Sequence, residues 1–216
     1  SKLLLSLYEL ICESCRFQYF SAFDSFDSIG IEQSTFYLSV INMLQESKGK
    51  ADALKPSIEL IVNNDLNRYT LYSDLMRELI GTLDNVDLKY KGIIIAEELI
   101  NAVIIKPQPK KNRYNSSSTN YNKIRKKNNL AELGLRLYAD LHEVEKGIKF
   151  YNKYYHENSE EVKLYILIEI LFELKDKENI EKELQKSVDK GIQLRKNLKN
   201  LLIELKKNAQ LPDYFR

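Results

Sequence analysis

The sequence predicts an all-α fold: seven to eight amphipathic helices packed as antiparallel hairpins, in a helical bundle or a short α-α superhelix, with a disordered basic loop. Only 7 Gly and 4 Pro occur in 216 residues, against typical usage of about 7% and 5%, so few positions suit the turns that many short strands need. Apolar residues instead recur every three or four positions, the period of a helix with one buried face. Hydrophobic residues make up 44% of the chain, enough for the core of one domain or two small ones.

Five helices are expected in the first half of the chain, over residues 3–20, 31–46, 56–66, 70–83 and 88–105. Pro56 suits the first turn of its helix, because its missing N–H would be unpaired there in any case. Asp87 is placed to cap the fifth helix, and Pro107 with Pro109 ends it.

The second half begins with residues 130–155, which predict one long helix or a hairpin broken near His142. Tyr138, Gly147 and Tyr151 have the spacing that aromatic, small and aromatic residues take where the two helices of a tetratricopeptide-like hairpin meet. The next 34 residues do not repeat this spacing cleanly, so it describes an architecture and assigns no family.

Ser159 is a good N-cap for a helix over residues 160–175, with two glutamates in its first turn. A last helix is expected over residues 178–208. Its leucines at 4-3-4 spacing fit a coiled-coil seam or, as we favour, one buried face of a bundle helix: Leu194, Leu198, Leu201 and Leu205.

Charge divides the chain into three parts. Residues 1–105 carry 9 basic and 15 acidic side chains, residues 106–129 carry 8 and none, and residues 130–216 carry 16 of each. We therefore expect an N-terminal helical half, a flexible basic linker over 106–129 and a C-terminal helical half, with the alternative of one continuous domain. The linker has too few aliphatic side chains to offset the entropy of ordering.

The basic linker is the candidate binding segment for a polyanion or a nuclear-import carrier. Its two basic clusters resemble a bipartite import signal, and tyrosines among them could stack on a single-stranded nucleic acid, giving a weak, salt-sensitive contact. An ordinary solvated loop explains the composition as well. The candidate residues are Lys110, Lys111, Arg113, Lys123, Arg125, Lys126 and Lys127.

Most catalytic and cofactor motifs are missing from the sequence. The glycines are never clustered, which excludes the Walker and dinucleotide-binding loops, so no cofactor is predicted. Cys12 and Cys15 form a C-x-x-C pair without a second pair for zinc, and no metal site is predicted. No uncharged apolar run is long enough to span a membrane, and two cysteines indicate a reducing compartment, so an intracellular protein, cytoplasmic or nuclear, is expected.

One catalytic arrangement remains. Arg136 followed six residues later by His142, on a helix of an all-α protein, resembles the motif of the HEPN ribonucleases. That resemblance implies a dimer in which Arg136 would hold phosphate and His142 would transfer protons. Two solvated residues on a long helix are the alternative.

The sequence favours a non-catalytic protein: a helical protein–protein interaction or scaffold module, an adaptor in a larger assembly. The HEPN-like ribonuclease and an accessory nucleic-acid-binding protein are the alternatives. Other proteins, contacted through helical surfaces, are the expected partners. The chain starts at Ser1 rather than Met, from which we expect a piece of a longer protein.

Overall fold

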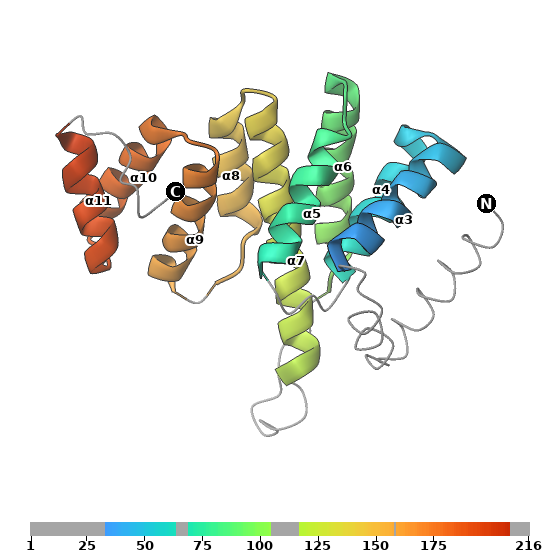
Figure 1. Ribbon diagram of the computed structural model, residues 1–216. Coiled ribbons are helices and arrows are strands. Elements are labelled where there is room, and N and C mark those ends of the chain that lie inside the picture. Colours follow the sequence, from blue (N-terminus) through green and yellow to red (C-terminus); the bar gives the residue numbers. More distant parts are fainter. Residues whose placement is uncertain (1–32, 64–68, 105–116, 158, 208–216) are drawn as a thin grey trace. The chain divides into compact units, whose positions relative to one another are not determined.

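The computed structural model describes residues 33–63, 69–104, 117–157 and 159–207, and all of their regular structure is helical, which confirms the all-α prediction (Figure 1). These ranges hold nine helices, more than the seven to eight expected. They are α3 (Gln33–Lys48), α4 (Lys50–Asn63), α5 (Tyr69–Gly81), α6 (Val86–Ala102), α7 (Ser117–Asp140), α8 (Val144–Tyr154), α9 (Glu160–Glu173), α10 (Lys177–Asp189) and α11 (Lys196–Lys206). The helix expected over 3–20 lies outside the described residues.

The chain divides into two compact units, Ser1–Leu99 and Ile100–Arg216. In the first unit α3, α4 and α5 pack against one another around fully buried aliphatic side chains: Ile41, Leu54, Ile58, Ile61, Leu75 and Leu79. The amide of Gln45 on α3 donates to the hydroxyl of Thr82, which follows α5, across 2.8 Å. This bond ties the end of α5 to α3.

Helix α4 starts six residues earlier than predicted. Gly49 has a φ of +81°, a left-handed conformation that ends α3, and α4 begins at the next residue. Pro56 therefore lies inside α4 and not in its first turn. A proline there donates no bond to the carbonyl four residues before it, which costs helix stability, and burial of the neighbouring Ile58 and Leu54 offsets that loss.

In the second unit α7 and α8 form the hairpin that was one of the two alternatives for residues 130–155. His142 lies in the connecting turn with a φ of 59°, and the amide of Glu143 donates to the carbonyl of Tyr138 at 2.8 Å, which closes the end of α7. Gly147 on α8 lets the two backbones approach. A Cβ at this position would lie 2.9 Å from the carbonyl oxygen of Leu135.

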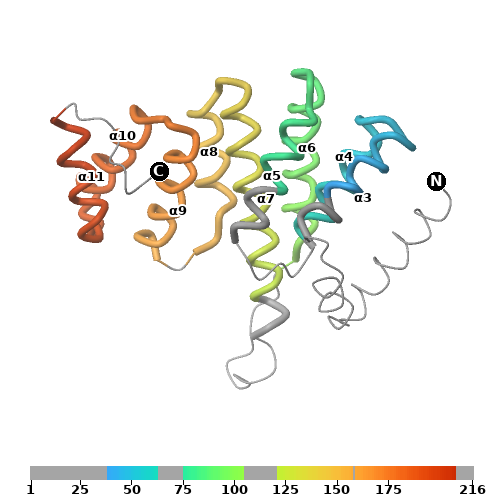
Figure 2. The backbone as a smooth tube through the Cα atoms, viewed as in Figure 1, coloured from blue at the N-terminus to red at the C-terminus, as the bar shows by residue number. Residues whose placement is uncertain are grey.

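Helices α7 to α11 are stacked so that each runs antiparallel to the next, and Figure 2 shows the path through α9, α10 and α11. Three ion pairs also join helices that are two positions apart in this stack. The pairs are Arg136–Glu173 between α7 and α9, Glu145–Lys182 between α8 and α10, and Glu161–Arg195 between α9 and the start of α11. Contacts between next and next-but-one helices are typical of stacked helical hairpins.

The single helix predicted over 178–208 is two helices in the structure. Gly191 has a φ of +73°, and the amide of Ile192 donates to the carbonyl of Ser187 at 2.9 Å, a bond that terminates α10. Residues 192–195 then lead into α11, whose buried leucines face the rest of the unit: Leu198, Leu201, Leu202 and Leu205.

The predicted linker also differs from the structure. From Ser117 onward the chain is helical and continuous with the buried part of α7, so residues 117–129 are not a loop. Propagation costs little once a helix is nucleated, and the buried residues 130–137 anchor this one. Residues 106–116 lie outside the described part of the chain.

Candidate functional site

Arg136 lies at the contact between α7 and α9, and not at the surface. It is 4% exposed, and its Nη2 lies 2.8 Å from Oε2 of Glu173 on α9. Glu173 keeps a 35% exposed side chain. The guanidinium is therefore neutralised by an internal partner from another helix.

Glu132 lies one turn before Arg136 on the same helix and is also 4% exposed. Burial, the largest cause, raises the pKa of this carboxyl from 4.5 to about 8. The positive charge of Arg136 works in the opposite direction, while the carboxylates of Glu173 and Glu169 raise the pKa further. At neutral pH Glu132 is therefore mostly protonated, and the contact avoids a second buried negative charge.

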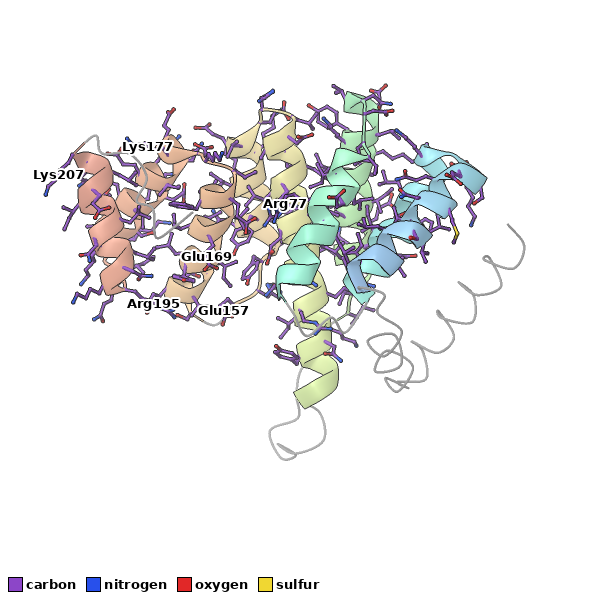
Figure 3. The ribbon with its side chains drawn as sticks, in the orientation of Figure 1. Arg77, Glu157, Glu169, Lys177, Arg195 and Lys207 are labelled. Carbon is purple, nitrogen blue, oxygen red and sulfur yellow. The ribbon has the colours of Figure 1, made fainter. Side chains whose placement is uncertain are left out.

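Helix α9 carries a stripe of polar side chains at intervals of four residues, and Glu173, the partner of Arg136, is its last member. The stripe consists of Glu161, Tyr165, Glu169 and Glu173. Tyr165 donates a hydrogen bond to Glu169, whose pKa is raised chiefly by partial burial. At the far end of the stripe from Glu173, Arg195 places its guanidinium 5.0 Å from the ring centre of Tyr165 and its Nε 3.0 Å from Glu161. Figure 3 labels Arg195 and Glu169. Arg136 thus pairs with Glu173 at one end of this stripe, and Arg195 pairs with Glu161 at the other end.

Tyrosines close the side of the cluster next to α8. Tyr151 is fully buried, donates its hydroxyl to the carbonyl of Lys163 on α9 and stacks on Tyr155, with ring centres 4.5 Å apart. Burial raises the pKa of the Tyr155 hydroxyl, and the nearby Glu132 raises it further. We name the group formed by Glu132, Arg136, Glu169 and Glu173 the α7–α9 polar cluster.

His142, the other half of the predicted ribonuclease pair, is exposed in the turn that follows α7. The structure therefore places the two residues in different environments, Arg136 inside a helix contact and His142 in solvent. A nuclease of this type needs both groups at one phosphate, with the histidine within hydrogen-bond reach of the reacting oxygen. The ribonuclease stays a prediction.

The predicted polyanion-binding residues fall into two groups. Lys110, Lys111 and Arg113 lie outside the described residues. The second group, Lys123, Arg125, Lys126 and Lys127, is on the first half of α7 and is partly exposed. The ammonium of Lys123 donates to the carbonyl of Ile104 at 2.9 Å, so part of this basic group is engaged within the chain.

Cys12 and Cys15 lie outside the described residues. In the described ranges no group of three or more His, Cys, Asp or Glu side chains is arranged to hold a metal ion. None of the helices in the same ranges has the length and apolar character needed to cross a bilayer.

The sequence singled out Arg136 but did not indicate that its side chain is buried against α9. The four-residue interval from Glu161 to Glu173 was a usable signal, since residues at that spacing share one helix face. The burial of Glu132 had no such signal, because a glutamate within an apolar run is ordinarily expected at the surface. No protein-family model, curated protein or solved structure matches the chain significantly.

Proposed function

We propose that the chain is a non-catalytic helical module that binds other proteins through its helical surfaces, as a subunit or domain of a larger assembly. The observation that carries the proposal is the stack of α7 to α11, in which ion pairs join each helix to the next but one. Such a stack presents an extended surface made of successive helices, which suits the binding of another chain.

The α7–α9 polar cluster supports this proposal because its charges are used within the helix contact. Arg136 is paired with Glu173, and Tyr165 is bonded to Glu169. Buried ionic groups of this kind favour one particular pairing of helices even where they add little net stability. We interpret the cluster as a device that fixes how α9 packs on α7.

Site-specific photo-crosslinking tests the proposal. A photoreactive amino acid is placed singly at exposed positions on three helices of the second unit, Lys149, Glu178 and Asn200, and the protein is expressed in the cells from which the gene comes. We expect neighbouring positions to capture the same protein, which then binds the purified chain with a fixed stoichiometry in calorimetry. Unrelated captures at every position, or no binding by any captured protein after purification, would contradict the proposal.

An assay with labelled RNA separates this function from the ribonuclease. The parent protein, an Arg136→Ala/His142→Ala variant and a His156→Ala control are incubated with the RNA under identical conditions. We expect no cleavage above background from any of the three. Cleavage that the double variant loses and the His156 variant keeps would replace our proposal with the nuclease.

A further inference from the structure

Helix α11 presents an exposed face that carries only one sign of charge. Its exposed positions follow a helical period and share one side of the helix, with Ile203, 52% exposed, between two pairs of lysines. The face consists of Lys196, Lys199, Asn200, Ile203, Lys206 and Lys207. We name it the α11 basic face.

Some lysines elsewhere in the second unit are paired with acidic side chains, whereas within the described ranges Lys149 and Lys175 are not. Lys182 pairs with Glu145 between two helices, and Lys186 pairs with Glu183 on α10. The α11 basic face gathers four lysines on one helix, and none of them forms an ion pair with any residue of the described ranges. The charge of this face is therefore not used to hold the unit together.

At the start of α11 the charge opposes the helix that carries it, whereas Lys206, in the last turn, is placed as the helix dipole favours. Helices α8, α9 and α10 each have acidic side chains in the first turn, where the helix dipole favours negative charge. Helix α11 has none there; it begins with Lys196 and Lys199, after an N-cap residue, Arg195, that makes no side-chain capping bond. Local choices that weaken a helix are expected where another requirement has prevailed.

We propose that the α11 basic face is the docking site for an acidic amphipathic helix of a partner protein. This inference rests on the proposed function and specifies its partner. Lys199 and Lys206 are seven residues apart, about 10 Å along the helix, so carboxylates two turns apart on the partner can reach both. An apolar residue between those carboxylates would cover Ile203.

A protein helix fits this face better than a nucleic acid or a lipid surface does. The face holds no aromatic side chain on which a base could stack, so a nucleic acid would be held through phosphates alone. The opposite face of α11 is buried against the unit, which leaves Ile203 as the one large apolar side chain on the exposed side. A single isoleucine is little for membrane insertion, whereas it suffices as the centre of a helix-to-helix contact.

The test uses a fluorescent 21-residue peptide with leucines along one helix face and glutamates on both flanks. Its binding to the purified chain is compared by anisotropy with that of a polyglutamate of equal charge, a single-stranded RNA and vesicles containing phosphatidylserine. We expect the amphipathic peptide to bind most tightly, and its affinity to fall as salt is raised. Equal or tighter binding of polyglutamate, RNA or vesicles would overturn the assignment, and so would self-association of the chain through this face in analytical ultracentrifugation.

Charge-reversal variants locate the binding. Lys199→Glu/Lys206→Glu should weaken the peptide by about tenfold or more, whereas the control Lys149→Glu/Lys175→Glu, with the same change in net charge on exposed lysines elsewhere in the unit, should stay within about twofold. Ile203→Ser, which keeps every charge, should reduce the preference for the amphipathic peptide over polyglutamate. Equal affinities for the two double variants would refute the inference.

Two further measurements keep the test interpretable. Far-UV circular dichroism checks the fold of each variant, and a neutralising change, Lys196→Gln/Lys199→Gln, replaces the charge reversal if that variant does not fold. The crosslinking described above separates the two proposals: a partner captured on α8 and α10, and unaffected by changes on α11, would refute the basic face as the docking site while the module keeps its proposed function.

Discussion

Glu132 offers a quantitative test of the structure, because a buried carboxyl with a raised pKa makes stability depend on pH. Its pKa rises from 4.5 to about 8 on folding. Below pH 4.5 the carboxyl is protonated in both the folded and the unfolded state, so it contributes no pH dependence. Between pH 4.5 and 8 only the unfolded state releases the proton. The folded state is then progressively disfavoured as pH rises, and above pH 8 the effect levels off.

The size of the effect follows from the same pKa values. While the folded state holds one more proton than the unfolded state, the free energy of unfolding falls by about 1.4 kcal/mol per pH unit. From pH 4.5 to 8 the loss amounts to roughly 3 to 5 kcal/mol. The groups that surround Glu132 enter this value: Arg136 opposes the rise in pKa, and Glu169 and Glu173 add to it.

Replacing Glu132 by glutamine removes the titrating group and keeps the shape of the side chain. The free energy of unfolding, measured by urea denaturation at pH 5, 6, 7 and 8 with circular dichroism, should fall less steeply with pH in the variant than in the parent. The difference between the two should grow steadily toward pH 8 in favour of the variant. The control Glu178→Gln, an exposed glutamate of α10, should follow the parent. Parallel profiles for the Glu132 variant and the parent would refute the burial of this carboxyl.

Three other changes test the packing of the second unit by the same denaturation assay. Gly147→Ala should lower the free energy of unfolding by about 1–3 kcal/mol, because the added Cβ meets a backbone oxygen at 2.9 Å. The control Gly81→Ala, with no atom within 4 Å of its Cβ, should be neutral or slightly stabilising. Similar losses for both variants would contradict the close approach of α7 and α8. Arg136→Ala should cost about 2 kcal/mol, less than for a fully buried pair because Glu173 retains access to water, and no measurable loss would place Arg136 at the surface. Lys182→Ala should change the free energy of unfolding little, because both partners of its ion pair are exposed, and high salt should remove the difference between variant and parent. A large, salt-independent loss would contradict that exposure.

The helices were predictable because their signals are local. Scarce glycine and proline and a three-to-four-residue apolar period indicated an all-α chain, and the structure confirms it over the described residues. The errors fall where two local signals compete. The leucine spacing from Leu194 to Leu205 suggested one helix, although Gly191 ends α10 before it and Leu194 lies in the connection to α11. Pro56 suggested a helix start although Gly49 already supplies one.

The α7–α9 polar cluster was not predictable, because its members are far apart in the sequence. Arg136 and Glu173 are separated by 37 positions, and nothing in either neighbourhood indicates that α9 packs on α7. The pKa of Glu132 likewise depends on its burial and on the carboxylates of α9, far along the chain. A single sequence therefore identified Arg136 as unusual and could not tell an exposed phosphate-binding arginine from one used in packing.

The charged side chains of the second unit differ in how they are paired, from the buried helix contact to the outer face of α11. At the α7–α9 contact, Arg136 meets its partner and Glu132 avoids ionisation, since an uncompensated buried charge would cost several kcal/mol. At the contact between α8 and α10 the paired charges are exposed and add little to stability. On the outer face of α11 the lysines have no acidic partner within the described ranges, and the first turn holds lysines where the helix dipole favours a glutamate. Since Lys196 and Lys199 oppose the dipole of their own helix and no described residue neutralises the four lysines, we propose that a partner supplies the missing carboxylates, and the binding of an acidic helix to α11 tests this directly.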